Sequence, residues 1–438
     1  MEIIPHAGFS LFSFLRAIPG ILILVLISYL ISVDRKNIPW RTVIIAFSVQ
    51  LLIGVCILKV PIVKIFFEKI GEIFIAIIDS TTAGTSFLFG SIINKEEYIF
   101  ALNVLPIIIF FSALTSVLYY FGIIQKIVGG FAFILKNLVK ISGAESFSLT
   151  GNIFLGQTEA PLLIKKYLSK MNNSEIYTVM IGGMATIAGS VMAGYIGFLG
   201  GENPIEKMNV TKNLLAASVM AAPGAVAIAK IIVPNPKKIL NDEISIYVDK
   251  SNENILDAIT NGTLQGLKLA FNVGALLLVF IALLALLNKI LFFIGDFSNL
   301  NLVIQQNTNY QELSLEFVLG FILAPIMWII GVAKEDITLM GQLLGIKIAA
   351  NEFLGYVYLS DLKNTINPIH LLYEKSIIMA TFMLCGFANF QSIAIQIGGL
   401  GSLAPNKIKV ISKYGVKAVI GGTIVSLISA TFAGMILG

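Results

Sequence analysis

Long apolar runs separated by short polar stretches occupy most of the sequence. Most of these runs approach or exceed the length of about 20 residues that a helix needs to cross the hydrocarbon core of a bilayer. The pattern therefore predicts an all-α polytopic membrane protein with eight transmembrane helices, at about 11–33, 42–58, 100–121, 177–199, 213–233, 264–294, between 375 and 407, and at 416–437.

Other stretches contain apolar residues without forming a clean crossing. Residues 61–97 alternate apolar and charged positions and predict surface or packing helices. Residues 123–141 are mostly apolar with lysines at intervals, a pattern that predicts an amphipathic helix in the cytoplasmic interface. Residues 200–212 and 295–312 are interpreted as polar loops, and residues 234–254, rich in Pro, Lys and Asp, as the longest soluble excursion up to that point.

One apolar neighbourhood holds an unusual set of polar side chains, in the sequence GNIFLGQTEAPLLIKKYL at residues 151–168. An ionisable side chain at membrane depth costs at least about 2.5–3.5 kcal/mol on insertion scales and usually faces a bundle interior or a cavity. Two glycines loosen the backbone, Thr158 is a candidate N-cap, and Pro161 falls in the first turn of the next helix. We therefore predict a re-entrant hairpin of two half-helices that meet at a polar tip, residues 155–159.

A second copy of this unit follows in the last third of the chain. The segment ANEFLGYVYL at 350–359 aligns with GNIFLGQTEA at 151–160 and shares Asn at the second position and Phe-Leu-Gly at the fourth to sixth. Downstream, Gly-Phe-Ala-Asn-Phe at 386–390 matches Gly-Met-Ala-Thr-Ile at 183–187. The sequence thus predicts an internal duplication, each copy being a hairpin, an interrupted helix and a terminal helix.

Charge indicates that the second copy is inverted. Each copy is expected to contain three full crossings and one hairpin. Because three is an odd number, the second copy should enter from the opposite side of the membrane and have the inverted topology. The first hairpin exits through the basic run at 165–170, whereas the second ends in Asp361. The basic turn at 34–41 is expected in the cytoplasm, which puts the N- and C-termini outside. Inverted repeats with broken helices near the midplane are typical of secondary transporters.

Composition excludes several other classes. The chain has 438 residues, of which 57% are hydrophobic and 13% charged, and a mean hydropathy of +0.89, too apolar for a soluble domain. The net charge of +5 lies beside apolar spans, which fits cytoplasmic loops better than a nucleic acid partner. Cys56 and Cys385 imply neither a disulfide framework nor a zinc site, and two histidines are too few for a metal cluster.

Four stretches together carry a specific resemblance. The sequences GQTEAPLLIKKYL, GMATIAGSVMAGY, AANEFLGY and LCGFANFQSIAIQIGGLGSLAP are similar to those of the concentrative nucleoside transporters, the cation-coupled symporters of nucleosides. The likeness extends over roughly residues 100–438, whereas residues 1–60 contribute only hydropathy. It implies a homotrimer with a scaffold and a moving transport domain built from the two hairpins and their neighbouring helices.

The resemblance also implies a substrate pocket. It assigns one group of side chains to the nucleobase, a second to the ribose hydroxyls and a third to packing against the base. Gln and Thr offer paired donors and acceptors to a pyrimidine edge, and a carboxylate can accept two hydroxyl protons from a ribose diol. The expected groups are Gln157, Thr158 and Glu159 for the base edge, Glu352, Asn389 and Ser392 for the ribose, and Val191 and Phe387 for packing.

For the coupling ion, the resemblance points to oxygen atoms at the first hairpin tip and in the first interrupted helix. These are the side-chain oxygens of Asn152 and Thr186 and the backbone carbonyls of Leu155 and Ile187. Five or six neutral oxygens suit a hard alkali cation, and free carbonyls arise where a helix unwinds. Sodium is therefore the expected ion and a proton the alternative.

Structural interpretations stay open for these residues. Glu159 and Glu352 could pair with lysines and fasten the hairpins to their neighbours, while Thr186 and Asn389 could hydrogen-bond between helices. The two apolar candidates could be ordinary core residues. The sixth crossing should also line the pocket, around residues 271–272.

Gln391 could face the pocket as well, but its orientation cannot be predicted from the pattern. The leading functional prediction is sodium-coupled nucleoside import by an elevator-like movement of the hairpin domain. A proton-coupled symporter of the same fold, with Glu159 or Glu352 titrating, is the first alternative. An intramembrane enzyme using the two Glu residues is the second, but no nucleophile or metal motif accompanies them, so the chain is not expected to be an enzyme.

The expected setting is a multi-pass protein of the inner or plasma membrane. The predicted organisation is N-terminal scaffold helices in 1–121, an interfacial helix in 122–142, a first transport unit in 143–233, a cytoplasmic loop with a scaffold helix and an outer loop in 234–312, and a second transport unit in 313–438.

Overall fold

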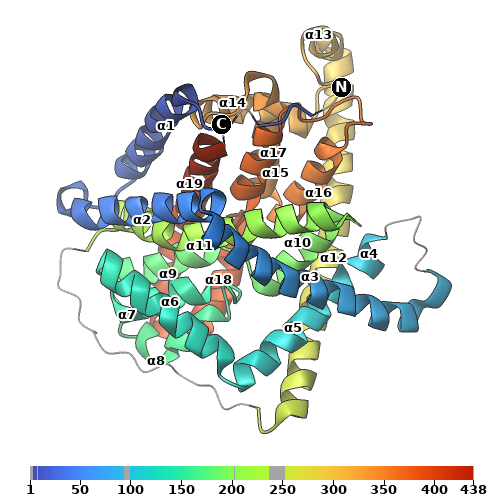
Figure 1. Ribbon diagram of the computed structural model, residues 1–438. Coiled ribbons are helices and arrows are strands. Elements are labelled where there is room, and N and C mark those ends of the chain that lie inside the picture. The colour runs from blue at the N-terminus through green and yellow to red at the C-terminus, as the bar shows by residue number, and fades with distance from the viewer. Residues whose placement is uncertain (1–2, 7, 93–98, 202, 236–251, 438) are drawn as a thin grey trace.

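The computed structural model describes residues 3–6, 8–92, 99–201, 203–235 and 252–437. These residues form helices joined by turns, and the β pairing among them is an isolated bridge between Ile4 and Tyr373. The all-α fold prediction is confirmed (Figure 1). Most of the soluble excursion predicted at 234–254, and the end of the segment 61–97, lie outside the described residues.

The first half of the chain contains the outer helices and the first hairpin. Its α-helices are α1 (Leu11–Leu30), α2 (Trp40–Lys59), α3 (Pro61–Phe89), α4 (Phe100–Asn103), α5 (Leu105–Tyr120), α6 (Ile123–Val139), α7 (Gly143–Gly151), α8 (Lys165–Leu168), α9 (Asn173–Ala185), α10 (Gly189–Gly200) and α11 (Pro204–Ile232). A 3-10 helix, η3 (Ala160–Ile164), precedes α8.

The second half begins with a very long helix and repeats the hairpin. Its α-helices are α12 (Ile255–Phe297), α13 (Leu300–Asn307), α14 (Leu315–Ile329), α15 (Ile337–Ala349), α16 (Glu352–Lys363), α17 (Glu374–Leu384), α18 (Phe390–Leu403) and α19 (Ile408–Leu437). Short 3-10 turns lie at Arg35–Asn37, Gly90–Ile92, Lys334–Asp336 and Pro405–Lys407.

Seven of the eight predicted crossings correspond to helical stretches long and apolar enough to span a membrane. The eighth is α17 followed by α18, which are separate short helices because residues 385–389 are not helical. Four of these predictions differ from the structure. The helices predicted from 213 and from 416 start earlier, at Pro204 and Ile408. The helix predicted for 264–294 runs over Ile255–Phe297, and the outer loop predicted at 295–312 contains α13.

Burial separates the helices into a core and a periphery. In the most apolar 18-residue stretch of each segment, 94% of the residues are buried in α9–α10, in α11 and in Pro405–Leu437, which contains α19. In α12 only 6% of such residues are buried. In Figure 1, α12 runs along one side of the molecule, while α9, α11 and α19 lie inside it. A helix that is apolar and exposed to this degree needs lipid or another chain around it.

The peripheral helices α5 and α12 pack closely because of small residues. A Cβ atom placed on Gly262 would lie 2.6 Å from Cβ of Ser116, and one on Gly266 would lie 2.8 Å from Cα of Ile109. Small residues at such positions let helix backbones approach one another, which is how helices associate within lipid. The pair α5–α12 therefore forms a firm outer wall.

The first hairpin is anchored at its base. Ser142 and Glu145 form a capping box at the start of α7. Buried Glu145 also pairs with Lys230 of α11, whose Nζ atom lies 3.2 Å from Oγ of Ser174 near the start of α9. Because removing one member of a buried ion pair leaves an uncompensated charge, this cluster fixes α7 against α9 and α11.

Candidate functional site

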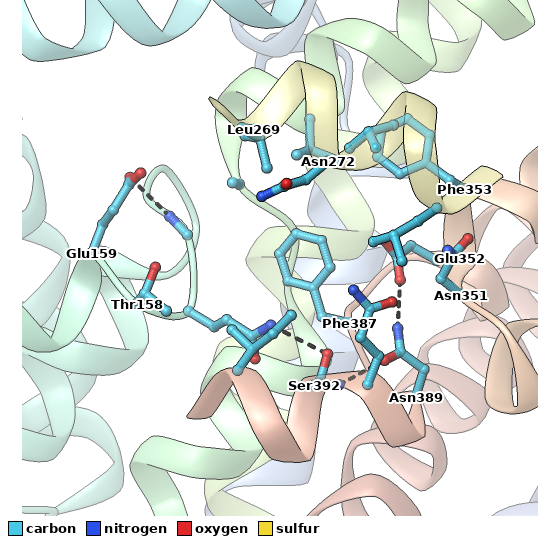
Figure 2. Close-up of a pocket in the computed structure, with 18 residues that line it drawn as sticks. Thr158, Glu159, Leu269, Asn272, Asn351, Glu352, Phe353, Phe387, Asn389 and Ser392 are labelled. Carbon is cyan, nitrogen blue, oxygen red and sulfur yellow. Dashed lines mark hydrogen bonds between the residues drawn. The ribbon is translucent and has the colours of Figure 1, made fainter. Parts of the chain in front are cut away.

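A pocket of about 280 Å³ lies where the first hairpin, the two interrupted helices and α12 meet. Figure 2 shows Thr158 and Glu159 at one end, Asn351 and Glu352 at the other, and the ring of Phe387 between them. The lining residues are Gly156, Gln157, Thr158, Glu159, Ala188, Val191, Leu269, Asn272, Val273, Leu276, Asn351, Glu352, Phe353, Phe387, Asn389, Gln391, Ser392 and Ile395.

The pocket owes its position to two helix interruptions that meet. Residues 186–188 separate α9 from α10, and residues 385–389 separate α17 from α18. Gly386 has a φ of +113°, and a Cβ atom there would lie 2.7 Å from the carbonyl carbon and oxygen of Ala185. Only glycine fits so close to another backbone in this conformation. The interruptions are therefore in direct contact.

At one end of the pocket, the Glu352 carboxylate is held by two donors. The hydroxyl of Tyr195 donates to Oε1 at 3.1 Å, and Nδ2 of Asn389 donates to Oε2 at 2.8 Å. Oδ1 of Asn389 in turn accepts from the backbone N–H of Ser392 at 2.8 Å and caps α18. The remaining lone pairs of Glu352 can accept hydroxyl protons from a ligand.

Between these two ends of the pocket, hydrogen bonds between amide and hydroxyl groups join the first hairpin to α18. Nε2 of Gln157 donates to Oγ of Ser392 at 3.2 Å, and Nε2 of Gln396 donates to Oε1 of Gln157 at 3.1 Å (Figure 2 shows the first of these). Gln396 also donates to the carbonyl of Met180 at 2.9 Å. The orientation of the Gln157 amide is thereby fixed through contacts on both sides.

At the opposite end, Glu159 accepts a single hydrogen bond within the described part of the chain, from the backbone N–H of Gly156 at 3.2 Å. Glu159 also borders a smaller cavity of about 120 Å³ on the side of α5, where hydroxyl groups collect. That cavity is lined by Ser112, Thr115, Ser116, Tyr119, Phe154, Leu155, Glu159, Leu162, Ser190, Asn252 and Gln265. Glu159 thus lies between the main pocket and a smaller, more polar cavity.

The residues expected to hold the ion lie together beside the pocket, all nearly fully buried. The N–H of Gly189 donates to the carbonyl of Phe154 at 3.0 Å, which fastens the hairpin tip to the first interruption. Nδ2 of Asn152 donates to the carbonyl of Ser148 at 2.9 Å, while its Oδ1 atom is buried and has no partner among the residues that the structure describes. Buried polar atoms normally have partners, so an acceptor without a donor suits a cation.

Other oxygens around the first interruption are available in the same way. The hydroxyl of Thr186 donates to the carbonyl of Gly182 at 2.8 Å, which leaves its own lone pairs free to face a cation. Among the described residues, the carbonyls of Leu155 and Ile187 accept no protein hydrogen bond. The donor set is therefore made of neutral oxygens, which a hard monovalent cation prefers.

All eight residues expected to contact a nucleoside line the one pocket, and the four expected to bind the ion lie at the adjoining tip and interruption. Neither Glu159 nor Glu352 forms a salt bridge with a lysine in the described part of the chain. Asn389 bonds to Glu352 across elements, as the structural interpretation also allowed, whereas Thr186 bonds within its own turn.

Several sequence-based details differ from the structure. Thr158 is not an N-cap, because residues 157–159 form a turn and η3 begins after Glu159, without a side-chain cap. The non-helical tip covers residues 152–159 and is longer than predicted. On α12 the pocket is lined by Asn272, while the side chain of Phe271 is 72% exposed.

Gln391, whose orientation could not be predicted, does line the pocket. Sequence reasoning left out other lining residues, among them Asn351 and Phe353 of the second hairpin and three apolar residues of α12. Asn351 carried a signal, because it is the asparagine shared by the two copies of the repeat. The α12 residues carried none, since apolar side chains surround that helix on every side.

Comparison with known proteins identifies sequence families over most of the chain. Residues 213–434 match the family described as "Na+ dependent nucleoside transporter C-terminus", residues 19–92 its N-terminus, and residues 101–202 the family described as "Nucleoside recognition". The chain is 39% identical to the nucleoside permease NupC of Helicobacter pylori, over 98% of this chain and 99% of that protein. It is 35% identical to the human sodium/nucleoside cotransporter 1, over 95% of this chain and 63% of that protein.

Solved structures give the same result. The structure of CNTnw in an inward-facing substrate-bound state has a TM-score of 0.87 and 36% identity, and covers 97% of this chain and 99% of its own. A variant of CNTnw in an outward-facing state has a TM-score of 0.89 and 35% identity, and covers 98% of this chain and 100% of its own. The resemblance stated from the sequence motifs is confirmed.

Proposed function

This chain belongs to the family of Na+ dependent nucleoside transporters, and we propose that it imports nucleosides by sodium symport. Its relatives and structural neighbours are nucleoside transporters and not enzymes, which sets the intramembrane enzyme aside. The observation that carries the proposal is the meeting of the eight expected nucleoside-contacting residues around one pocket with a polar group at each end.

The nucleoside would lie along the pocket with its ribose at Glu352. The carboxylate there, already oriented by Tyr195 and Asn389, can accept both protons of a ribose diol, while Ser392 is near enough to share in the contact. Phe387 and Val191 offer apolar surface to a planar base. Such a division, apolar walls with a few fixed polar groups, is typical of small-molecule sites.

The base edge would face the first hairpin. Gln157 is oriented by Ser392 and Gln396, and Thr158 and Glu159 line the same end of the pocket. This arrangement supports recognition of a nucleobase through its hydrogen-bonding edge, with water filling the space that side chains do not reach.

Sodium would bind at the adjoining tip, on oxygens of Asn152, Leu155, Thr186 and Ile187. The orphaned Oδ1 atom of Asn152 and the two free carbonyls support this part of the proposal. Because the tip carries both the ion ligands and Gln157, an ion bound there would order the base end of the pocket. Coupling between ion and nucleoside follows from that shared backbone.

A proton is the alternative coupling ion, and one observation favours it. Among the described residues Glu159 accepts only one hydrogen bond, from a backbone N–H, and it lies between the pocket and the smaller polar cavity. A carboxylate in that position could carry a proton between the two. The sodium proposal is preferred because the oxygens of Asn152, Leu155, Thr186 and Ile187 include no titratable group, and Oδ1 of Asn152 is without a partner among the described residues.

We propose an elevator-type movement within a homotrimer of the cell membrane, with both termini outside. The close packing of α5 against α12 and the burial of the hairpin bundle support a scaffold and a transport body on either side of the pocket. The exposed apolar length of α12 supports contact with lipid or with further copies of the chain.

The experiment is uptake of radiolabelled uridine into proteoliposomes, with adenosine as a competitor. An inward sodium gradient is compared with matched potassium and inward proton gradients. Sodium-dependent accumulation is the expected result, and competition by adenosine would decide between pyrimidine and broad selectivity. Proton-driven uptake would replace the sodium proposal with its alternative, and no uptake under any gradient would contradict both.

A further inference from the structure

A cavity of about 240 Å³ outside the nucleoside pocket has a basic lining. It lies between the N-terminal segment, the start of α1, the turn after α14, the start of α17 and the end of α19. Arg16 and Lys375 line it together with His6, and in the described part of the chain no lining residue is acidic. The cavity is therefore a candidate site for an anion.

Most hydrogen-bond donors of the two cations are not used within the described protein. Nη2 of Arg16 donates to the carbonyl of Trp328 at 2.9 Å, and Nζ of Lys375 donates to Oγ of Ser13 at 3.2 Å. Neither side chain forms a salt bridge among the described residues. Because a guanidinium has five N–H donors and an ammonium three, both groups keep donors for a ligand.

The carboxylates of neighbouring residues do not neutralise this pair. An oxygen of Glu374 lies 3.5 Å from Nε2 of His6, and Asp336 accepts from two backbone N–H groups at 2.9 and 3.2 Å. Arg16 and Lys375 are close enough to repel each other electrostatically. Two like charges held side by side are unfavourable, and an anion between them would offset that repulsion.

The cavity adjoins a surface that faces lipid. Phe12, which lines it, is 74% exposed, and Trp328, whose ring centroid lies 5.6 Å from the guanidinium carbon of Arg16, is 61% exposed. Leu15 and Leu22 continue the exposed apolar surface along α1, which lies on the outside of the molecule (Figure 1). Arg16 is in the second turn of this span, so its side chain can reach the level of the lipid head groups, where tryptophan is also enriched.

We propose that this cavity binds the phosphate diester head group of an anionic membrane phospholipid, with an acyl chain along α1. Arginine and lysine form charge-assisted hydrogen bonds to phosphate oxygens, and basic pockets beside transmembrane helices bind lipid head groups in this way. A free phosphate ion shares this chemistry, but the exposed apolar surface beside the cavity favours an anion that carries acyl chains. A zwitterionic lipid fits less well, because its own cation would be repelled by Arg16 and Lys375.

The two tryptophans of the chain provide the readout, because one of them lies at the proposed site. In the full-length protein reconstituted in vesicles, Trp40→Phe leaves Trp328 as the only tryptophan. Brominated acyl chains quench tryptophan fluorescence at contact range, so brominated phosphatidylglycerol and brominated phosphatidylcholine report the relative affinity of the two lipids. Each cation near an anionic lipid contributes about fivefold in affinity, so we expect a preference for phosphatidylglycerol of about 25-fold.

The decisive variant combines Arg16→Gln and Lys375→Gln in this background. Glutamine keeps donors for the carbonyl of Trp328 and for Ser13 but removes both charges, so the lipid preference should be lost. The matched control combines Arg35→Gln and Lys36→Gln, which remove the same charges just beyond the other end of α1, and should keep the preference. Equal preference in the two double variants would overturn the proposal.

Two further measurements keep the proposal falsifiable. Lys375→Gln alone retains the bond from Arg16 to Trp328, and should reduce the preference about fivefold if the double variant does not fold. Millimolar inorganic phosphate at constant ionic strength should leave the preference unchanged. Loss of the preference in phosphate would assign the cavity to a free anion, and a wild-type site without any preference would refute an anion site altogether.

Discussion

The two hairpins begin from matching sequences and adopt different backbone structures. In the first, Phe-Leu-Gly at 154–156 lies in an eight-residue non-helical tip, 152–159. In the second, Phe-Leu-Gly at 353–355 lies inside α16, and only residues 350–351 separate the half-helices. A short motif shared by two repeats thus fixes where the hairpin turns but not how its chain continues.

The residues after the motif account for the difference. In the first hairpin Pro161 lacks an N–H and disfavours helical geometry in the residue before it, so the chain resumes as a 3-10 helix. In the second hairpin no Gly or Pro follows Gly355 within α16, and Oδ1 of Asn351 accepts from the N–H of Leu354 at 2.9 Å to cap the helix. Helical structure therefore resumes after eight residues in the first hairpin and after two residues in the second.

The consequence is a difference in satisfied polar groups. Among the described residues, the tip of the first hairpin keeps acceptors without donors, at Asn152 and Leu155, whereas Oδ1 of Asn351 in the second hairpin accepts a hydrogen bond from Leu354. A tip with free acceptors suits a ligand that leaves, and a satisfied tip suits a fixed wall. Four predictions test this comparison, ordered from the largest expected effect.

Gly386→Ala should affect the protein most, because it pushes the two interruptions apart. The new Cβ would lie 2.7 Å from backbone atoms of Ala185, in addition to a strain of about 1–3 kcal/mol for its φ of +113°. We expect loss of monodisperse folded protein in size-exclusion chromatography. Gly156→Ala is the control, since its Cβ would meet Ala188 at an ordinary 3.5 Å. Wild-type behaviour of Gly386→Ala would show that the interruptions do not need contact.

Glu352→Gln should weaken uridine binding by about 2–3 kcal/mol, roughly a hundredfold, because ribose hydroxyls would lose a charged acceptor. Calorimetry at saturating sodium measures this loss. Glu159→Gln provides the comparison within the same pocket and should have a smaller effect, since Glu159 accepts only one backbone hydrogen bond. Unchanged affinity of Glu352→Gln would refute the ribose assignment.

Asn152→Ala should lower the apparent sodium affinity roughly tenfold, because the ion loses a ligand. At saturating sodium, the uridine affinity of the variant should equal that of the wild type. Uridine binding titrated at a series of sodium concentrations provides the measurement. If uridine affinity were reduced equally at every sodium concentration, Asn152 would not be an ion ligand.

Asn351→Ala, the matched change in the second hairpin, should have the smallest effect. Loss of the α16 cap should reduce stability by about 1 kcal/mol, seen as a lower unfolding temperature. Asn203→Ala removes a similar cap, on α11, and is the control. We expect the sodium affinity of both variants to equal that of the wild type. A fall as large as in Asn152→Ala would remove the difference between the hairpins.

Much of the fold was predictable because apolar runs report crossings directly. The errors in helix bounds occurred where a helical segment has a polar sequence. The first turns of α11 are polar, so hydropathy indicated a loop, although Asn203 and Pro204 are a cap and a first-turn proline. The polar segment that contains α13 was interpreted as a loop for the same reason.

The pocket was predictable as far as polar residues identified it. Buried polar side chains in an apolar chain stand out, and the repeat supplied their partners. On α12 that signal fails, because successive residues of a helix point about 100° apart and the apolar pattern gives no register. An error of one residue therefore separates Phe271, which is 72% exposed, from Asn272, which lines the pocket.

The length of α12 has a consequence for the membrane that surrounds it. Its 43 residues extend about 65 Å, roughly twice the hydrophobic thickness of a bilayer. The helix must therefore lie obliquely or project into water, and the acyl chains decide how much of it is immersed. Since Leu269 and Asn272 of this helix close one side of the pocket, we expect bilayer thickness to influence the height at which the pocket meets its wall. Lipid chain length is therefore expected to affect the transport rate.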